Sequence, residues 1–214
     1  MPGSCSRVAL NALEEIGLAY RDRGIALMRG EQRGEAFVSL NPKGKLPVLV
    51  TDGVVTTELP AILYHLANIH PRASLLPMGT DGRPDLAALS DVIWLASALH
   101  PLANRIFRPA AVSQIDQAGV KAAAIDLLAA QASGIATRLS NRMWWYGDAW
   151  SSVDTFIAWI FWVAHASGFP APEFPVLLEH RARVEARPAF TRTLARERAA
   201  VARDNLPLPP GFSI

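Results

Sequence analysis

The 214-residue sequence has little that would mark a secreted, metal-bound or membrane protein. Its single cysteine, Cys5, excludes an intrachain disulfide framework and a zinc site made of several cysteines, and it fits a reducing compartment. The most apolar run, residues 156–164, is far shorter than the ~20 residues that a membrane span needs. The N-terminus shows no positive stretch followed by an apolar segment, so we expect no signal peptide. We therefore expect a cytoplasmic protein without a membrane partner.

An excess of charge of one sign is also lacking. The formal net charge is +2, and the arginine-rich stretch 181–203 is interleaved with acidic residues. Because the signs cancel locally, this stretch is interpreted as a solvated helix face and not as a nucleic-acid surface. We expect no nucleic-acid partner.

Nucleotide and metal motifs are missing as well. The glycines are not spaced as G-x-G-x-x-G after a strand, and Gly44-Lys45 is followed by Leu46 where a phosphate-binding loop has Ser or Thr. The five histidines show no metal-ligand spacing with one another or with Cys5. We predict neither a nucleotide loop nor a metal site.

Residues 1–77 alternate between helical and strand-like patterns. Apolar residues recur at helical spacing from Arg7 to Ile16, and Gly17 is typical of a helix end. The Asp52-Gly53 pair lies between two β-branched runs and is a strong signal of a hairpin. The predicted elements are a helix over 7–16, a strand over 20–27, a short helix over 36–40, hairpin strands over 46–50 and 54–57, and a helix over 58–68.

Everything beyond a linker is predicted to be helical. Residues 71–84 are rich in Pro, Gly and Asp, so we place a domain boundary there. Ser151 and Asp154 have the spacing of a capping box ahead of an apolar helix. The expected domains are residues 1–77, with helices and strands, and residues 84–214, with helices alone. Within the second domain, helices are predicted over 86–107, 116–139, 152–166, 173–186 and 189–204.

Three side chains that can carry chemistry, Ser4, Cys5 and Ser6, stand at the entrance to the first helix. Backbone N–H groups and the positive end of the helix dipole stabilise a thiolate, so a lowered pKa is expected for Cys5. The alternative is that Ser4 or Ser6 only caps the helix and that Cys5 is a small buried residue.

Two further positions have unusual local chemistry. Pro47 lies inside an apolar strand signal, where it requires an edge position or a special geometry such as a cis bond. Glu58 lies at the start of a helix, where free N–H groups can accept a ligand carboxylate while the side chain pairs with a ligand ammonium. A glutamate that simply complements the helix dipole is an equally good interpretation of Glu58.

Taken in order, these motifs resemble the glutathione S-transferase family over nearly the whole chain. They are Pro-Gly-Ser-Cys-Ser at 2–6, Asn-Pro-Lys-Gly-Lys-Leu-Pro-Val-Leu at 41–49, the Asp-Gly hairpin, Thr-Glu at 57–58 and an all-helical remainder. The resemblance implies a thioredoxin-like α/β domain that binds glutathione, followed by an all-α domain that completes the substrate pocket. The family usually has a short strand before the Pro-Gly-x-Cys segment, so the first strand is expected to be missing or truncated.

The resemblance also assigns roles to residues of the first domain. It implies that Pro47 is cis, that the main chain of Leu46 pairs with the cysteinyl part of glutathione, and that Glu58 holds the γ-glutamyl end. The segment around Cys5 is similar to bacterial beta-class members, in which this cysteine contacts or covalently bonds glutathione. Neighbouring Lys45 and Leu59 complete the predicted glutathione contacts, although the family usually has a serine or threonine where Leu59 stands.

Two more residues enter through the same resemblance. His100, in the first helix of the second domain, corresponds to a beta-class histidine that reaches the active site. Arg29 falls near a basic residue that contacts the glycyl carboxylate of glutathione.

The function implied is that of a homodimeric glutathione transferase, with glutathione as co-substrate and no metal. Its thiolate would act on a small hydrophobic, electrophilic or disulfide-bearing substrate. The alternative is a non-catalytic interaction or dimerisation module with the same fold.

Overall fold

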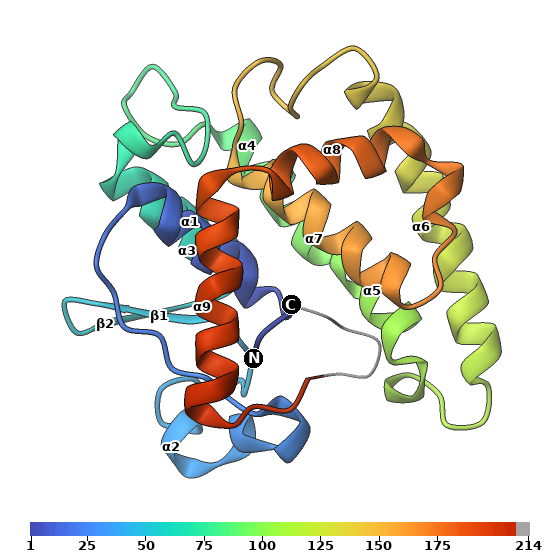
Figure 1. Ribbon diagram of the computed structural model, residues 1–214, viewed down its shortest axis with the longest axis horizontal. Helices are drawn as coiled ribbons and strands as arrows, with labels where there is room; N and C mark the ends of the chain where they lie inside the picture. Colours follow the sequence, from blue (N-terminus) through green and yellow to red (C-terminus); the bar gives the residue numbers. More distant parts are fainter. Residues whose placement is uncertain (209–214) are drawn as a thin grey trace. The chain divides into compact units, whose positions relative to one another are not determined.

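The computed structural model describes residues 1–208, which form two compact units. One unit contains residues 1–84 together with residues 187–208, and the other contains Asp85–Ala186. The sequence suggested that residues 187–204 belong to the helical domain. Instead, α9 (Pro188–Asp204) packs against α1 (Ser6–Ile16) in the first unit (Figure 1). Polar contacts between residues far apart in the sequence hold this pair of helices together.

The first unit has a thioredoxin-like arrangement with a small sheet. Its two strands pair antiparallel, and α3 (Leu59–Ile69) packs against both α1 and β2 (Val54–Thr57). Leu63 and Leu66 of α3 and Val8 of α1 are almost completely buried in its core. Besides α1 and α9 the unit contains η1 (Leu27–Arg29), η2 (Glu31–Arg33), α2 (Glu35–Val38), β1 (Val48–Thr51), β2 (Val54–Thr57), α3 (Leu59–Ile69) and η3 (Pro71–Ala73).

The predicted hairpin is confirmed. Thr51 pairs with Val54 across the two-residue loop Asp52-Gly53, and both loop residues have positive φ, 50° and 79°. These are the angles of a type I′ turn, whose twist matches that of the strands beside it. Local turn chemistry therefore determines the register of the sheet.

The predicted strand over 20–27 is wrong. Residues 18–26 have no regular secondary structure, and side chains of α9 satisfy part of their backbone: Gly24 donates its N–H to Asp204 at 2.9 Å, and Arg203 donates to the carbonyl of Asp22 at 3.0 Å. A strand needs a ladder partner, and the only strand that pairs with β1 in the described part of the chain is β2. The β-like sequence at 20–27 has no strand to join.

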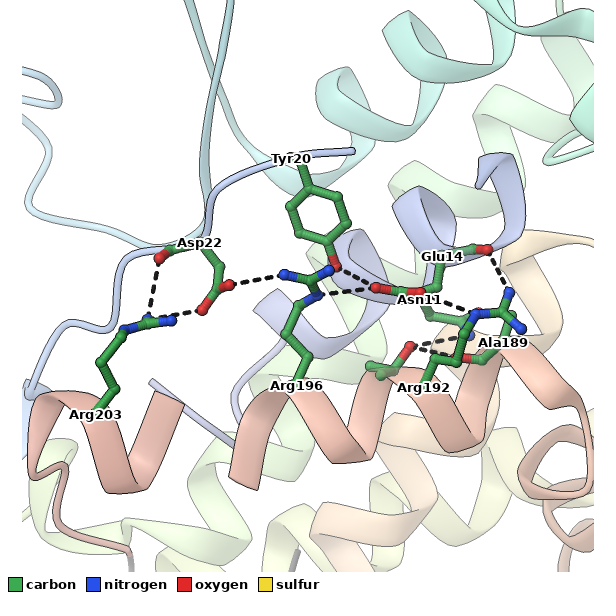
Figure 2. A network of polar contacts seen from close by, with 9 residues as sticks. Asn11, Glu14, Tyr20, Asp22, Ala189, Arg192, Arg196 and Arg203 are labelled. Carbon is green, nitrogen blue, oxygen red and sulfur yellow. Dashed lines mark hydrogen bonds and ion pairs between the residues drawn. The ribbon is translucent and has the colours of Figure 1, made fainter. Parts of the chain in front are cut away.

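A polar network fastens this irregular segment to α1 and α9 (Figure 2). The Tyr20 hydroxyl donates to Glu14 at 2.8 Å, and Arg196 donates to Glu14 at 2.9 Å and to Asp22 at 3.0 Å. Arg203 donates to the Asp22 carboxylate at 2.9 Å. The arginine-rich stretch identified in the sequence is therefore in part a docking face for residues 14–22.

The second unit is all-helical in its described residues, as predicted. The apolar helix α7 (Ser152–Ala166) lies at its centre, with Phe156 and Ile160 fully buried. The predicted capping box is present, with the Ser151 N–H donating to Asp154 at 2.9 Å. The elements are α4 (Leu86–Trp94), η4 (Leu95–Leu99), α5 (His100–Phe107), η5 (Pro109–Ala111), α6 (Gln117–Leu139), α7 (Ser152–Ala166), η6 (Ala171–Glu173) and α8 (Pro175–Glu185).

One continuous helical stretch of the second unit is long. Residues Leu86–Phe107 are long and apolar enough to cross a membrane by length and composition alone. Core helices of globular proteins pass the same test, and Val92, Leu95 and Leu99 are completely buried inside the unit. This helix is weak evidence for a membrane span.

Candidate functional site

The loop that leads into α1 is fixed by a buried ion pair. Arg7 of α1 donates two hydrogen bonds to one carboxylate oxygen of Glu197 in α9, at 2.9 and 2.7 Å. The other oxygen of Glu197 accepts the N–H of Gly3 at 2.9 Å. Both charged side chains are almost fully buried, at 4% and 1% exposure. Glu197 therefore positions the turn that carries Cys5.

The Cys5 thiol meets the backbone just before Pro47. Its Sγ lies 3.6 Å from the carbonyl oxygen of Leu46, in the geometry of a hydrogen bond donated by the thiol. The Leu46–Pro47 peptide bond is cis, as the resemblance implied. The start of α1 and the residue before the cis bond therefore face each other within the first unit.

The thiol is not activated in the way that its place on the helix suggested. Burial raises the pKa of Cys5 to about 11, opposed by the positive charge of the chain's amino group and by a backbone hydrogen bond. The negative charge of the Glu58 carboxylate raises this pKa further. The expected lowering of the pKa is wrong because desolvation raises the pKa of the thiol by more than the N-terminus of the helix lowers it. At neutral pH Cys5 is a thiol and a hydrogen-bond donor.

The two serines beside Cys5 are engaged in local bonds. The Ser4 hydroxyl donates to the carbonyl of Met1 at 2.6 Å and lies 3.1 Å from the Ser6 hydroxyl. The Ser6 N–H also donates to Ser4 at 3.4 Å. These bonds shape the turn around Cys5.

Glu58 has a strained backbone at the start of α3. Its φ is +70°, which is uncommon for a residue other than glycine and occurs most often at functional sites. Its carboxylate lies 2.8 Å from Nζ of Lys43, and both side chains are 56% exposed. Lys43 was not among the predicted site residues, although it lies within the Asn-Pro-Lys-Gly motif noted at 41–49.

The chain before Leu46 is held by a buried amide. Asn41, 1% exposed, donates to the carbonyl of Lys45 at 2.8 Å and accepts the N–H of Lys43 at 3.2 Å. The Lys45 side chain itself is exposed. The Asn41 side chain thus fixes the approach of the backbone to Leu46.

The side chains of two further predicted residues have contacts within the protein. The Leu59 side chain is buried in the core. The guanidinium of Arg29 is exposed and donates to the carbonyl of Asn205 at 2.9 Å. The structure therefore brings Cys5 to Leu46, and it gives the side chains of Arg29 and Leu59 other contacts.

His100 lies in the second unit at the start of α5, directly after the π-helical turn η4. Its ring packs edge-on against Trp159 at 4.8 Å and against Phe156 at 6.2 Å, centroid to centroid. Turns of this kind occur frequently at functional sites. No group of three or more His, Cys, Asp or Glu side chains in residues 1–208 could hold a metal ion.

Comparison with known proteins gives one consistent picture. The profile described as "Glutathione S-transferase, N-terminal domain" matches residues 3–91. A maleylpyruvate isomerase from Ralstonia sp is 34% identical over 99 residues, which are 46% of this chain and 44% of that protein. This chain thus aligns with about half the length of several curated relatives.

Solved structures match over much more of the chain. A sphingomonad glutathione S-transferase in complex with glutathione has a TM-score of 0.79 and 29% identity, covering 92% of this chain and 96% of that one. A beta-class glutathione S-transferase from Sphingomonas chungbukensis has a TM-score of 0.78 and 26% identity, with 92% and 96% covered. Together with the cis bond before Pro47 and the two-unit architecture, these similarities show that the chain belongs to the glutathione S-transferase family.

Proposed function

We propose that this chain is a glutathione-dependent enzyme that binds glutathione on its first unit, as an extended tripeptide paired with the main chain of Leu46. The observation that carries the proposal is the contact between Cys5 and Leu46, which directs a thiol at the backbone before the cis bond. The sphingomonad structure with similar architecture is a complex with glutathione, which supports the same ligand here.

Glu58 can bind the γ-glutamyl end of glutathione through charge pairing. This end carries an ammonium and a carboxylate, and the carboxylate of Glu58 already pairs with the ammonium of Lys43. A ligand ammonium would share or replace that pairing, while the ligand carboxylate would meet Lys43 and the first N–H groups of α3. The exposure of this pair leaves it accessible to a ligand.

The nucleophile in this proposal is the sulfur of glutathione. Burial raises the pKa of Cys5 to about 11, so at neutral pH its thiol can donate a hydrogen bond to a glutathione thiolate. The cysteinyl N–H of glutathione would take over the carbonyl of Leu46, which releases the Cys5 thiol for this contact. Cys5 then stabilises the thiolate through a hydrogen bond.

Three kinds of substrate follow from a bound thiolate. With a carbon electrophile, a C–S bond forms and the leaving group departs with its electron pair. With a disulfide, the thiolate displaces one sulfur as a new thiolate. With an electron-poor cis double bond, reversible addition allows rotation to the trans form before the thiolate leaves, and the name of the Ralstonia relative favours including this isomerisation.

The remaining expectations belong to the same proposal. We propose that His100 contributes to catalysis, that Arg29, Lys45 and Leu59 flank the glutathione site, and that the protein is a cytoplasmic homodimer. The second candidate, a non-catalytic interaction module, is favoured by Leu59, which has no hydroxyl to donate to the ligand.

Binding and turnover separate the two candidates. Retention on immobilised glutathione, followed by assays with chlorodinitrobenzene, hydroxyethyl disulfide and maleylpyruvate, should give binding and at least one measurable turnover. Replacing Cys5 with Ala should lower that turnover while leaving retention intact. Retention without turnover on any substrate would favour the module, and absence of both would contradict the proposed ligand.

A further inference from the structure

Lys43 and Glu58 form an exposed pair of opposite charges at the start of α3. The ammonium Nζ of Lys43 lies 2.8 Å from Oε1 of Glu58, and each side chain is 56% exposed. The same Nζ donates to the Thr57 hydroxyl at 3.2 Å. Exposed ion pairs add little to stability, because solvent screens the attraction and two long side chains must be ordered. Stability alone therefore gives little reason for this pair.

Each member of the pair keeps hydrogen-bonding capacity for a ligand. A lysine ammonium has three N–H donors, and Lys43 uses two of them, on Glu58 and Thr57. The carboxylate of Glu58 accepts at Oε1, and no hydrogen bond to its Oε2 is made within residues 1–208. One positive donor and one negative acceptor therefore stand side by side, and both are accessible to solvent.

The backbone holds both partners in place. Glu58 is the N-cap of α3, yet its side chain makes no capping hydrogen bond, and its φ is +70°. Such angles persist only where the surrounding structure imposes them, and they cluster at binding sites. On the other side, the Asn41 side chain accepts the N–H of Lys43 at 3.2 Å. The two charges are therefore presented by two fixed points of the main chain.

The start of α3 itself offers a ligand carboxylate few donors. Leu59 stands where the family usually has a hydroxyl, and its side chain is buried in the core. Pro60, the second residue of the helix, has no N–H. Of the first three helical residues, only Leu59 and Ala61 therefore have a main-chain donor. A positive side chain beside them would supply the missing attraction, and Lys43 is such a side chain.

We propose that Lys43 is a specificity-determining residue of the glutathione site. It binds the α-carboxylate of the γ-glutamyl group in place of the hydroxyl that Leu59 lacks, while Glu58 binds the ammonium on the same carbon atom. Resting on the proposed function, this assignment defines the ligand class as peptides whose γ-glutamyl end carries both charges free. It also removes the reason that Leu59 gives for a non-catalytic module.

A neutral pair of charges selects a zwitterion. A ligand with a single charge is attracted by one member of the pair and repelled by the other, so the two effects nearly cancel. An ammonium and a carboxylate on one carbon atom, set antiparallel to the pair, are attracted by both members. Loss of either charge, from the ligand or from the protein, therefore removes much of the attraction.

Three ligands separate the two charges. Glutathione carries both, γ-aminobutyryl-Cys-Gly keeps only the ammonium, and glutaryl-Cys-Gly keeps only the carboxylate. In isothermal titration, Lys43→Met should weaken binding of glutathione and of glutaryl-Cys-Gly by about tenfold or more. The same substitution should leave γ-aminobutyryl-Cys-Gly bound as before or more tightly, because it removes a repelling charge. Glu58→Gln should give the opposite pattern with the two analogues.

Two further variants control for charge and for position. Lys43→Arg keeps the positive charge and should retain the affinity for glutathione to within about threefold, and failure of this rescue would contradict a role for the charge. Lys121→Met, in α6 of the second unit, is the matched control and should bind all three ligands like the parent chain.

The outcomes separate this assignment from the proposed function. If the parent chain binds glutathione and Lys43→Met weakens all three ligands equally, or weakens none, Lys43 does not recognise the α-carboxylate and the assignment is overturned alone. A parent chain that binds none of the three ligands would overturn the proposed function and the assignment together.

Discussion

The sulfur of Cys5 lies 3.6 Å from the carbonyl oxygen of Leu46. The one thiol of this protein therefore donates a hydrogen bond to the main-chain group with which we propose that glutathione pairs. Thiol donation agrees with a pKa raised to about 11 by burial. A cysteine in this state has a role different from that of a helix-activated thiolate. It can donate a hydrogen bond to another sulfur, and it reacts slowly by itself.

Alkylation of Cys5 should therefore be slow and strongly pH-dependent. With a pKa of about 11, the thiolate fraction at about pH 8 is about a thousandth, against about a quarter for a free cysteine of pKa ~8.5. The rate with iodoacetamide, followed by mass spectrometry, should rise about tenfold per pH unit up to the edge of the stable range. The urea-unfolded chain is the control, and a rate that levels off near pH 8 in the folded protein would contradict the raised pKa.

Glu58→Gln should weaken glutathione binding by at least about tenfold, because the bond to a ligand ammonium loses its charge assistance. Isothermal titration with glutathione measures this directly. Glu35→Gln, at an exposed position of α2, is the matched control and should bind like the parent chain. Equal affinities for both variants would remove Glu58 from the binding site.

Glu197→Gln should destabilise the protein by about 3–5 kcal/mol, because it leaves the buried guanidinium of Arg7 without its counter-charge. Urea unfolding gives the free-energy change. Glu185→Gln breaks a surface pair with Arg181 at i, i+4 and should cost less than about 1 kcal/mol. If both substitutions cost the same, Glu197 is not the residue that ties the Cys5 turn to α9.

Asp154→Ala should strongly destabilise the second unit. Its carboxylate accepts the N–H of Ser151 at 2.9 Å and that of Trp145 at 2.7 Å, and it lies 2.9 Å from the His180 ring, all in the interior. Losing these partners together should lower the unfolding free energy by roughly 3–5 kcal/mol. Asp116→Ala removes an exposed N-cap of α6 and should cost only about 1 kcal/mol in the same measurement.

Local chemistry made some elements predictable. Asp52-Gly53 determines the hairpin through the two positive φ angles that the turn requires, and Ser151 with Asp154 determines where α7 begins. In each case the interacting groups lie within a few residues of one another. These two elements can therefore be predicted from the local sequence alone.

Features that depend on distant partners could not be predicted in this way. The strand over 20–27 fails because a strand needs a neighbour, and the low pKa expected for Cys5 fails because burial is a property of the folded unit. Glu197 was missed because its bond to Gly3 spans 194 positions of the sequence. Packing of α9 on α1 creates this part of the site.

Adding glutathione to the isotopically labelled protein and following its backbone amides by NMR shows whether glutathione pairs with the main chain of Leu46. Pairing of glutathione with this main chain predicts saturable shifts of these amides of the first unit: Ser4, Cys5, Ser6, Leu46, Val48, Glu58, Leu59 and Ala61. Saturable shifts that spare the amides of Leu46 and Glu58, or no saturable shift at all, would contradict it.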